Sequence, residues 1–270
     1  MTIITDNNRS LIDPFQRKIE YLRLSVTDKC NMRCFYCMPK GFKGFEQPEH
    51  WLNFDEIERV IAAFAELGVS RIRVTGGEPL VRKNINELVS RIHQLPGVED
   101  LSLSTNATLL AQHADSLYEA GVSRLNISLD SLRPERFKKI TGSELQPVID
   151  GMMAAKAAGF SPIKINMLAM KDINDDEFED VVEYCIENDF TLRFIETMPM
   201  GDDSVNASDH YLDLAEVKDR LAQRYDLIPG VMPGGGPARY VQEKILNYAL
   251  VLLLPYHSIF VKPAIVFDYR

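Results

Sequence analysis

The alternation of strand-like and helix-like segments restricts the fold of this chain most strongly. Strands are predicted at 21–26, 71–75, 100–104, 123–128, 163–168 and 191–196, and helices at 56–67, 84–94, 109–120, 146–158 and 175–187, with Asp55 as the first N-cap and a turn of helix after Pro134. Strands separated by helices form parallel sheets with right-handed crossovers. Because six strands are too few to close an eight-stranded barrel, the sequence predicts an α/β fold, a partial (β/α)6 TIM-type barrel.

The segments outside this alternation have other compositions. We expect an N-terminal arm over 1–18, the barrel over 19–198, a cap over 199–243 that contains an amphipathic helix at 212–225, and an aberrant tail over 244–270. The arm lacks the apolar centre of a signal peptide, and the apolar part of the tail is too short to span a membrane. A net charge of −9 without a lysine or arginine block argues against nucleic-acid and membrane partners.

Three cysteines follow the first predicted strand: Cys30, Cys34 and Cys37 have the spacing C-x3-C-x2-C. A loop this short can place three thiolates around one four-iron cluster, which leaves one iron free for a small molecule. A zinc site completed by a distant residue, or unrelated thiols, are the alternatives. Cys185 is predicted as a buried helix residue. Four cysteines so distributed do not form a disulfide framework and favour a reducing cytoplasm.

Polar residues mark the carboxyl ends of the predicted strands. They are Thr75-Gly76-Gly77-Glu78, Ser104-Thr105-Asn106, Ser128-Leu129-Asp130, Asn166 and Glu196-Thr197-Met198. In parallel α/β sheets, functional groups gather at this end of the strands. We therefore expect one site at the mouth of the partial barrel.

The cysteine spacing, together with Gly76-Gly77-Glu78-Pro79, resembles the radical S-adenosylmethionine (SAM) superfamily, whose members bind SAM at the open iron. Four segments narrow the resemblance to the GTP 3′,8-cyclase family of molybdenum cofactor biosynthesis: Arg23–Asp28, Arg71–Pro79, Asn126–Leu132 and Arg193–Met198. This resemblance implies a partial barrel of the radical SAM class. It also implies a lyase that converts GTP to (8S)-3′,8-cyclo-7,8-dihydroguanosine 5′-triphosphate.

Residue roles follow from the resemblance, position by position. It places a [4Fe-4S] cluster on Cys30, Cys34 and Cys37, SAM on Tyr36, Gly77, Ser128 and Met198, and GTP on Arg23, Arg73, Ser104 and Lys164, and the chemistry of Glu78 adds that residue to the SAM contacts. Physical chemistry agrees, because a carboxylate suits the methionyl ammonium group and three cations suit a triphosphate. Taken singly, each cation is also compatible with a solvated or paired charge. The implied partners are GTP, an electron donor such as a flavodoxin or ferredoxin, and a second copy of the chain in a homodimer.

The chain departs from that family at two places. Ala107 stands where the family has glycine, at a position expected to need a left-handed backbone. After residue 243 the chain lacks the Cys-x-x-Cys, the later cysteine and the Arg-x-Arg that carry a second four-iron cluster in the family. One permitted set of codons for 257–270 encodes Gln-His-Phe-Cys-Glu-Thr-Cys-Asn-Arg-Val-Arg-Leu-Ser in a second reading frame, which is compatible with a frameshift.

The missing region changes the expected function. We expect the first cluster to assemble and SAM to be cleaved, with GTP binding and cyclisation impaired. Two alternatives stay open. One is a single-cluster radical SAM enzyme with another substrate, and the other is a non-catalytic iron–sulfur or zinc binding module.

Overall fold

The centre of the molecule is a curved sheet of parallel strands that neighbour one another in chain order. The computed structural model describes residues 10–13, 16–38, 51–197 and 209–230, and beyond these the strands at 238–243, 248–253 and 265–267. The six central strands are β1 (Tyr21–Ser25), β2 (Arg71–Thr75), β3 (Asp100–Thr105), β4 (Arg124–Ser128), β5 (Ile163–Ala169) and β6 (Thr191–Glu196). The predicted partial (β/α)6 barrel is confirmed, because every predicted strand lies within about one residue of the observed bounds.

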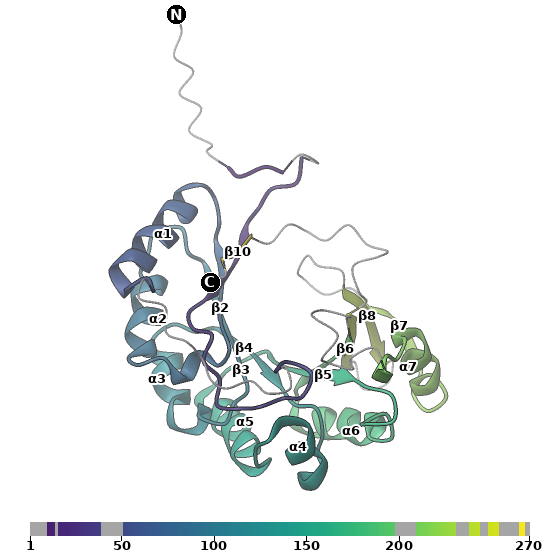
Figure 1. Cartoon of the computed structure of the whole chain (residues 1–270). Coiled ribbons are helices and arrows are strands. Elements are labelled where there is room, and N and C mark those ends of the chain that lie inside the picture. Colours follow the sequence, from purple (N-terminus) through teal and green to yellow (C-terminus); the bar gives the residue numbers. More distant parts are fainter. Residues whose placement is uncertain are drawn as a thin grey trace, which may run out of the picture.

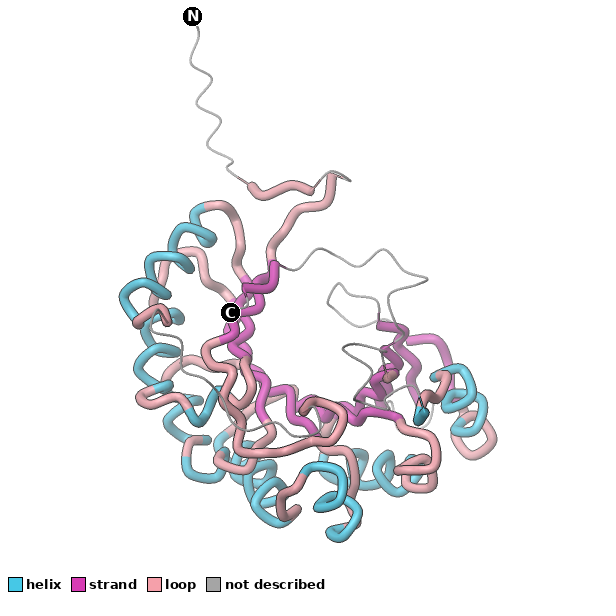
Figure 2. The backbone as a smooth tube through the Cα atoms, in the orientation of Figure 1, coloured by secondary structure: helices cyan, strands magenta, loops and turns pink. Residues whose placement is uncertain are grey.

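Helices cover the convex face of this sheet (Figure 1). They are α1 (Phe54–Glu66), α2 (Ile85–His93), α3 (Ala114–Glu119), α4 (Pro134–Thr141), α5 (Gln146–Ala158) and α6 (Phe178–Asn188), with the short 3-10 helices η1 (Pro79–Val81) and η2 (Leu110–Gln112). The strands form the inner layer of the arc (Figure 2). Because each crossover returns through the helical layer, the six carboxyl ends of the strands meet at one rim.

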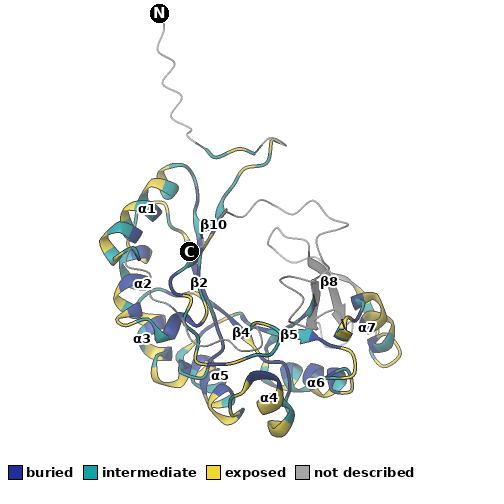
Figure 3. Ribbon diagram, viewed as in Figure 1, coloured by how far each residue is buried: buried dark blue, intermediate teal, exposed yellow. Residues whose placement is uncertain are grey.

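Strand residues alternate between two environments. Leu22 and Leu24 of β1, and Ile72 and Val74 of β2, belong to the apolar core that the helices cover (Figure 3). Arg23, between the two leucines, faces the other way and lines a cavity. Closed TIM barrels usually fill their interior with branched apolar side chains. Here the polar half of each strand faces inward, which leaves the interior to polar groups.

The start of α1 differs from the sequence prediction. Asn53, and not Asp55, is the N-cap: its side chain accepts a hydrogen bond from the Glu56 N–H (3.0 Å), and the Glu56 carboxylate accepts one from the Asn53 N–H (2.8 Å). This capping box satisfies two backbone donors that the helix leaves free. Asp55 lies in the first turn instead, where its charge favours the positive end of the helix.

The segments after β6 extend the sheet. After α7 (Leu214–Leu221) come β7 (Leu227–Gly230), β8 (Ala238–Glu243), β9 (Tyr248–Leu253) and β10 (Ile265–Phe267). β9 pairs in parallel with β6, and β10 pairs in parallel with β1. Residues 1–9 of the predicted arm and 199–208 of the predicted cap lie outside the described residues, so the domain boundaries stay predictions. No helix in the described part of the chain has the length and apolarity needed to cross a membrane.

Candidate functional site

A cavity of about 360 Å³ lies at the carboxyl ends of the strands. Nine predicted site residues line it: Arg23, Cys30, Cys34, Tyr36, Cys37, Arg73, Gly77, Ser104 and Ser128. Glu78 is buried next to the cavity wall, and Lys164 lies on β5 two residues before Asn166, which lines the cavity. Met198 lies outside the described residues. The structure thus brings nine of the twelve predicted residues to one cavity, while the ligand that each contacts stays a prediction.

The cysteine loop, residues 30–37, is tied to two neighbouring elements. At its start, the side chain of Asn106, just after β3, donates to the Cys30 Sγ (3.8 Å). In its middle, the Arg33 N–H donates to the carbonyl of Thr141 at the end of α4 (2.8 Å). Because β3 and α4 both belong to the barrel, these contacts fix the loop at its rim.

The turn after β2 packs against the chain that enters the cysteine loop. The Gly77 N–H donates to the Thr27 carbonyl (2.7 Å). A Cβ at Gly76 would lie 2.3 Å from the Thr27 oxygen, and one at Gly77 would lie 2.4 Å from the Asp28 oxygen and 2.5 Å from the Lys29 oxygen. No side chain fits at such distances, so both positions need glycine. The family resemblance assigned Gly77 to SAM, and the structure adds that the chain's own backbone approaches this glycine closely.

Glu78 joins this turn to the end of β3. Its fully buried carboxylate accepts hydrogen bonds from the Thr105 hydroxyl (2.7 Å), the Asn106 N–H (2.6 Å) and the Leu80 N–H (3.1 Å). Burial raises the pKa of Glu78, and the three hydrogen bonds oppose that rise. The carboxylate therefore organises the cavity wall, and its contact with the methionyl ammonium group stays a prediction.

All three thiols of the cysteine loop line the same cavity. In the described ranges, no three His, Cys, Asp or Glu side chains converge closely enough to hold one metal ion. A cluster binds each cysteine to a different iron, so thiols spread around one cavity fit it.

Burial also favours the protonated form of these thiols in the free chain. Burial raises the pKa of Cys30 and Cys34, and burial followed by the charge of Asp130 raises the pKa of Cys37 to about 11. Iron ligands must be thiolates, so cluster assembly at this loop would release protons.

Cationic side chains occupy the same interior. Arg23 and Arg73 are neighbours in register on β1 and β2. The Nε of Arg73 is buried and has no hydrogen-bond partner within the described part of the chain, and burial lowers the pKa of this residue. Burial, and then the charges of Arg193, Arg124 and Arg73, lower the pKa of Lys164 to about 8. Like charges gathered in this way favour a polyanionic ligand.

Among the cavity-lining residues that were not predicted as ligands, Arg193 and Asp130 make notable hydrogen bonds. Arg193 donates from Nε to the Asn166 Oδ1 (2.8 Å) and from Nη2 to the Asn126 Oδ1 (2.5 Å). Arg193 lies between two buried apolar residues of β6, so strand alternation predicts that its side chain faces the other side of the sheet, toward the cavity. Asp130 accepts a hydrogen bond from the Tyr36 hydroxyl (2.5 Å). The sequence gives no signal for this contact, because it joins a loop to a distant strand end.

Known proteins match both the sequence and the fold. The family model of the radical SAM superfamily matches residues 24–185. GTP 3′,8-cyclase of Hydrogenovibrio crunogenus is 49% identical over 224 residues, which cover 82% of this chain and 68% of the relative. GTP 3′,8-cyclase of Petrotoga mobilis is 41% identical over 230 residues, covering 85% and 71%, and GTP 3′,8-cyclase 2 of Pseudomonas aeruginosa is 47% identical over 236 residues, covering 86% and 70%.

Solved structures with a similar fold are more distant in sequence. SuiB of Streptococcus suis bound to S-adenosylmethionine has a TM-score of 0.60 at 20% identity, over 76% of this chain and 48% of that one. HydG, a maturase of the [FeFe]-hydrogenase, has a TM-score of 0.58 at 15% identity, over 75% of this chain and 48% of that one. At such identities the likeness concerns the fold alone. The sequence matches are closer and span the barrel, and by them the chain belongs to the GTP 3′,8-cyclase family of the radical SAM superfamily.

Proposed function

We propose that this chain is a radical SAM lyase of the GTP 3′,8-cyclase type that takes GTP as its substrate but, with a single cluster, forms little of the 3′,8-cyclised nucleotide of molybdenum cofactor biosynthesis. One observation carries the proposal: the three thiols and the guanidinium groups of Arg23, Arg73 and Arg193 line a single cavity. Such an enzyme needs an electron source beside a polyanion site. Relatives at 41–49% identity are named GTP 3′,8-cyclase, which supports the choice of substrate.

Two cofactors belong to this proposal. Cys30, Cys34 and Cys37 would hold a [4Fe-4S] cluster, and SAM would bind to Tyr36, Gly77, Glu78, Ser128 and Met198. When bound, a reduced cluster would supply one electron for breaking a carbon–sulfur bond of SAM, which would yield methionine and a 5′-deoxyadenosyl radical. The chain's own task is to orient SAM beside the substrate and to keep water from that place.

The cationic side chains would bind the substrate by its triphosphate. Arginine presents two parallel N–H donors to phosphate oxygens, as Arg23 and Arg73 can, whereas Lys164 acts as a point charge. The Ser104 hydroxyl is a further candidate contact. Because the protein carries a net charge of −9, the attraction for an anion must come from such local groups.

The number of cysteines limits what the chain can assemble. Cys185 is fully buried in α6, as predicted, and three cysteines remain for cluster binding within these 270 residues. We therefore propose one cluster, GTP held by its triphosphate alone, and little cyclised product. The same observation keeps a single-cluster enzyme with another substrate as the second candidate. The electron donor of the flavodoxin or ferredoxin type, the homodimer and the cytoplasmic location stay predictions.

Anaerobic reconstitution with iron and sulfide tests the proposal. We expect about four irons per chain, release of 5′-deoxyadenosine after reduction with SAM, and little cyclised nucleotide from GTP. If the protein does not bind GTP but releases 5′-deoxyadenosine rapidly when a different substrate is added, the second candidate is favoured. One zinc per chain without 5′-deoxyadenosine would support a non-catalytic module and contradict both enzymes.

A further inference from the structure

Asp130 is a buried carboxylate that the proposed mechanism does not yet use. It lies two residues after β4 and is 3% exposed. Its Oδ2 accepts a hydrogen bond from the Tyr36 hydroxyl (2.5 Å), and its Oδ1 accepts one from the Leu168 N–H (2.9 Å). A carboxylate is costly to bury unless its oxygens are hydrogen-bonded, so these two donors define the conformation of Asp130.

The hydrogen bond between Tyr36 and Asp130 joins two segments of the cavity wall. Tyr36 lies between Cys34 and Cys37, and 94 positions separate it from Asp130 in the sequence. Asp130 follows Ser128, a predicted SAM contact, at the end of the same strand. This side-chain contact therefore sets the distance between the last two cysteines of the loop and the β4 side of the cavity.

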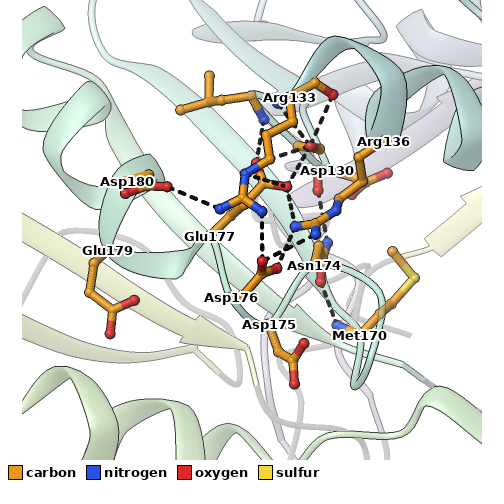
Figure 4. Close-up of polar contacts among 12 residues, drawn as sticks. Asp130, Arg133, Arg136, Met170, Asn174, Asp175, Asp176, Glu177, Glu179 and Asp180 are labelled. Atoms are coloured by element: carbon orange, nitrogen blue, oxygen red, sulfur yellow. Dashed lines mark hydrogen bonds and ion pairs between the residues drawn. The ribbon is translucent and has the colours of Figure 1, made fainter.

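The buried side-chain amide of Asn174 binds the backbone of Asp130. The Asn174 Nδ2 donates to the carbonyls of Asp130 (2.8 Å) and Leu168 (2.9 Å), and its Oδ1 accepts from the Met170 N–H (2.9 Å). Figure 4 shows Asn174 between Asp130 and Met170. One side chain thus fixes the backbone of Asp130 to the end of β5.

Glu177 holds the next two residues in the same way. Its fully buried carboxylate accepts hydrogen bonds from the Ser131 hydroxyl (2.7 Å), the Leu132 N–H (2.9 Å) and the Arg136 guanidinium (2.5 Å). In Figure 4 this carboxylate lies beside Arg133 and Arg136. Since each residue from Asp130 to Leu132 is anchored, this segment is a rigid support for Tyr36.

We propose that Asp130 is a positioning residue: it holds Tyr36, and with it the cysteine loop, in the orientation in which SAM contacts the loop and Ser128 together. The inference rests on the proposed function and deepens it. Without the hydrogen bond, the three thiols still hold a cluster, but the loop can turn relative to β4. A site that must order itself on binding has a lower affinity than a preorganised one.

Tyr36→Phe tests this most directly, because it removes the hydroxyl and keeps the ring. The dissociation constant of SAM is measured per intact cluster, from the change that SAM causes in the electron paramagnetic resonance spectrum of the reduced protein. We expect wild-type iron content and roughly tenfold weaker SAM binding, as for loss of one hydrogen bond to a buried charge. Asp130→Ala should also weaken binding, and the double variant should be no worse than Asp130→Ala, because both changes remove the same contact.

Asp176→Asn is the matched control. Asp176 is the exposed carboxylate that pairs with Arg133 and Arg136, and its loss should leave SAM affinity unchanged. Wild-type affinity and an unchanged spectrum in Tyr36→Phe would overturn the inference, as would a loss of iron with normal SAM affinity in the remaining clusters. If the wild-type protein itself gives no spectral response to SAM, the proposed function fails instead.

Discussion

At the scale of single residues, Glu78 is the buried charge on which two loops depend. Its carboxylate accepts from Thr105, Asn106 and Leu80, and Glu78→Gln would turn an amide NH2 toward at least one of these donors. We expect the free energy of unfolding to fall by about 1–3 kcal/mol, the cost of a buried unsatisfied group. Urea denaturation of the cluster-free chain measures this. Glu87→Gln, on the exposed side of α2, should change it by less than about 0.5 kcal/mol; equal losses in the two variants would contradict the prediction.

Lys164 predicts a pH dependence of substrate binding. Burial and neighbouring arginines lower its pKa to about 8, so the ammonium group loses its proton as the pH rises through that value. The affinity for GTP should therefore be full below this pH and fall above it. Lys164→Arg keeps its charge throughout and should show a flatter profile. Calorimetric titration with GTP on either side of pH 8 makes the comparison, and parallel profiles for the two proteins would count against a role for Lys164.

At the scale of elements, the turn after β2 and the cysteine loop depend on each other. Gly77→Ala would place a methyl group 2.4 Å from the Asp28 oxygen, which must move and take the loop with it. We expect most of the iron to be lost on reconstitution. Gly97→Ala is the control, since Gly97 has a φ of +87° but its Cβ would lie 3.5 Å from the nearest atom. It should cost about 1–2 kcal/mol of stability through backbone strain and leave iron content unchanged. Equal iron in the two variants would show that the contact does not matter.

The elements that the sequence predicts well are those with a local pattern. The six central strands have one apolar and one polar face, so period-two alternation locates them. Asp55 and Asn53 are both good caps by residue type, and the capping box that Asn53 forms with Glu56 decides between them. Ala107 has the left-handed φ of +62° that was expected where the family has glycine.

Contacts between distant segments gave no such signal. β9 and β10 depend on pairing with β6 and β1, far away in the chain, and were not predicted. The partners of Glu78 and Asp130 are likewise tertiary, so residue type alone did not reveal that each carboxylate organises a loop.

At the scale of the whole molecule, the apolar core lies between the sheet and the helices that cover it, and charged side chains lie on the concave side of the sheet. The interior gathers Arg23, Arg73, Lys164 and Arg193, whose mutual repulsion an anion would relieve. We expect GTP at a hundred times its dissociation constant to add about 2.7 kcal/mol to stability, and to raise the melting temperature by several degrees. Guanosine, which lacks phosphate, should have little effect. Scanning calorimetry tests this, and equal shifts with both compounds would exclude the triphosphate as the stabilising group.

The contact of Gly76 and Gly77 with residues 27–29 has a consequence for engineering. Anyone who grafts the three-cysteine loop onto another parallel barrel must transplant the glycine pair with it, although 38 positions lie between Cys37 and Gly76 in the chain. In a barrel whose turn carries side chains at these two positions, the Cβ atoms would displace the grafted loop, and its thiols would be misplaced even before a metal binds.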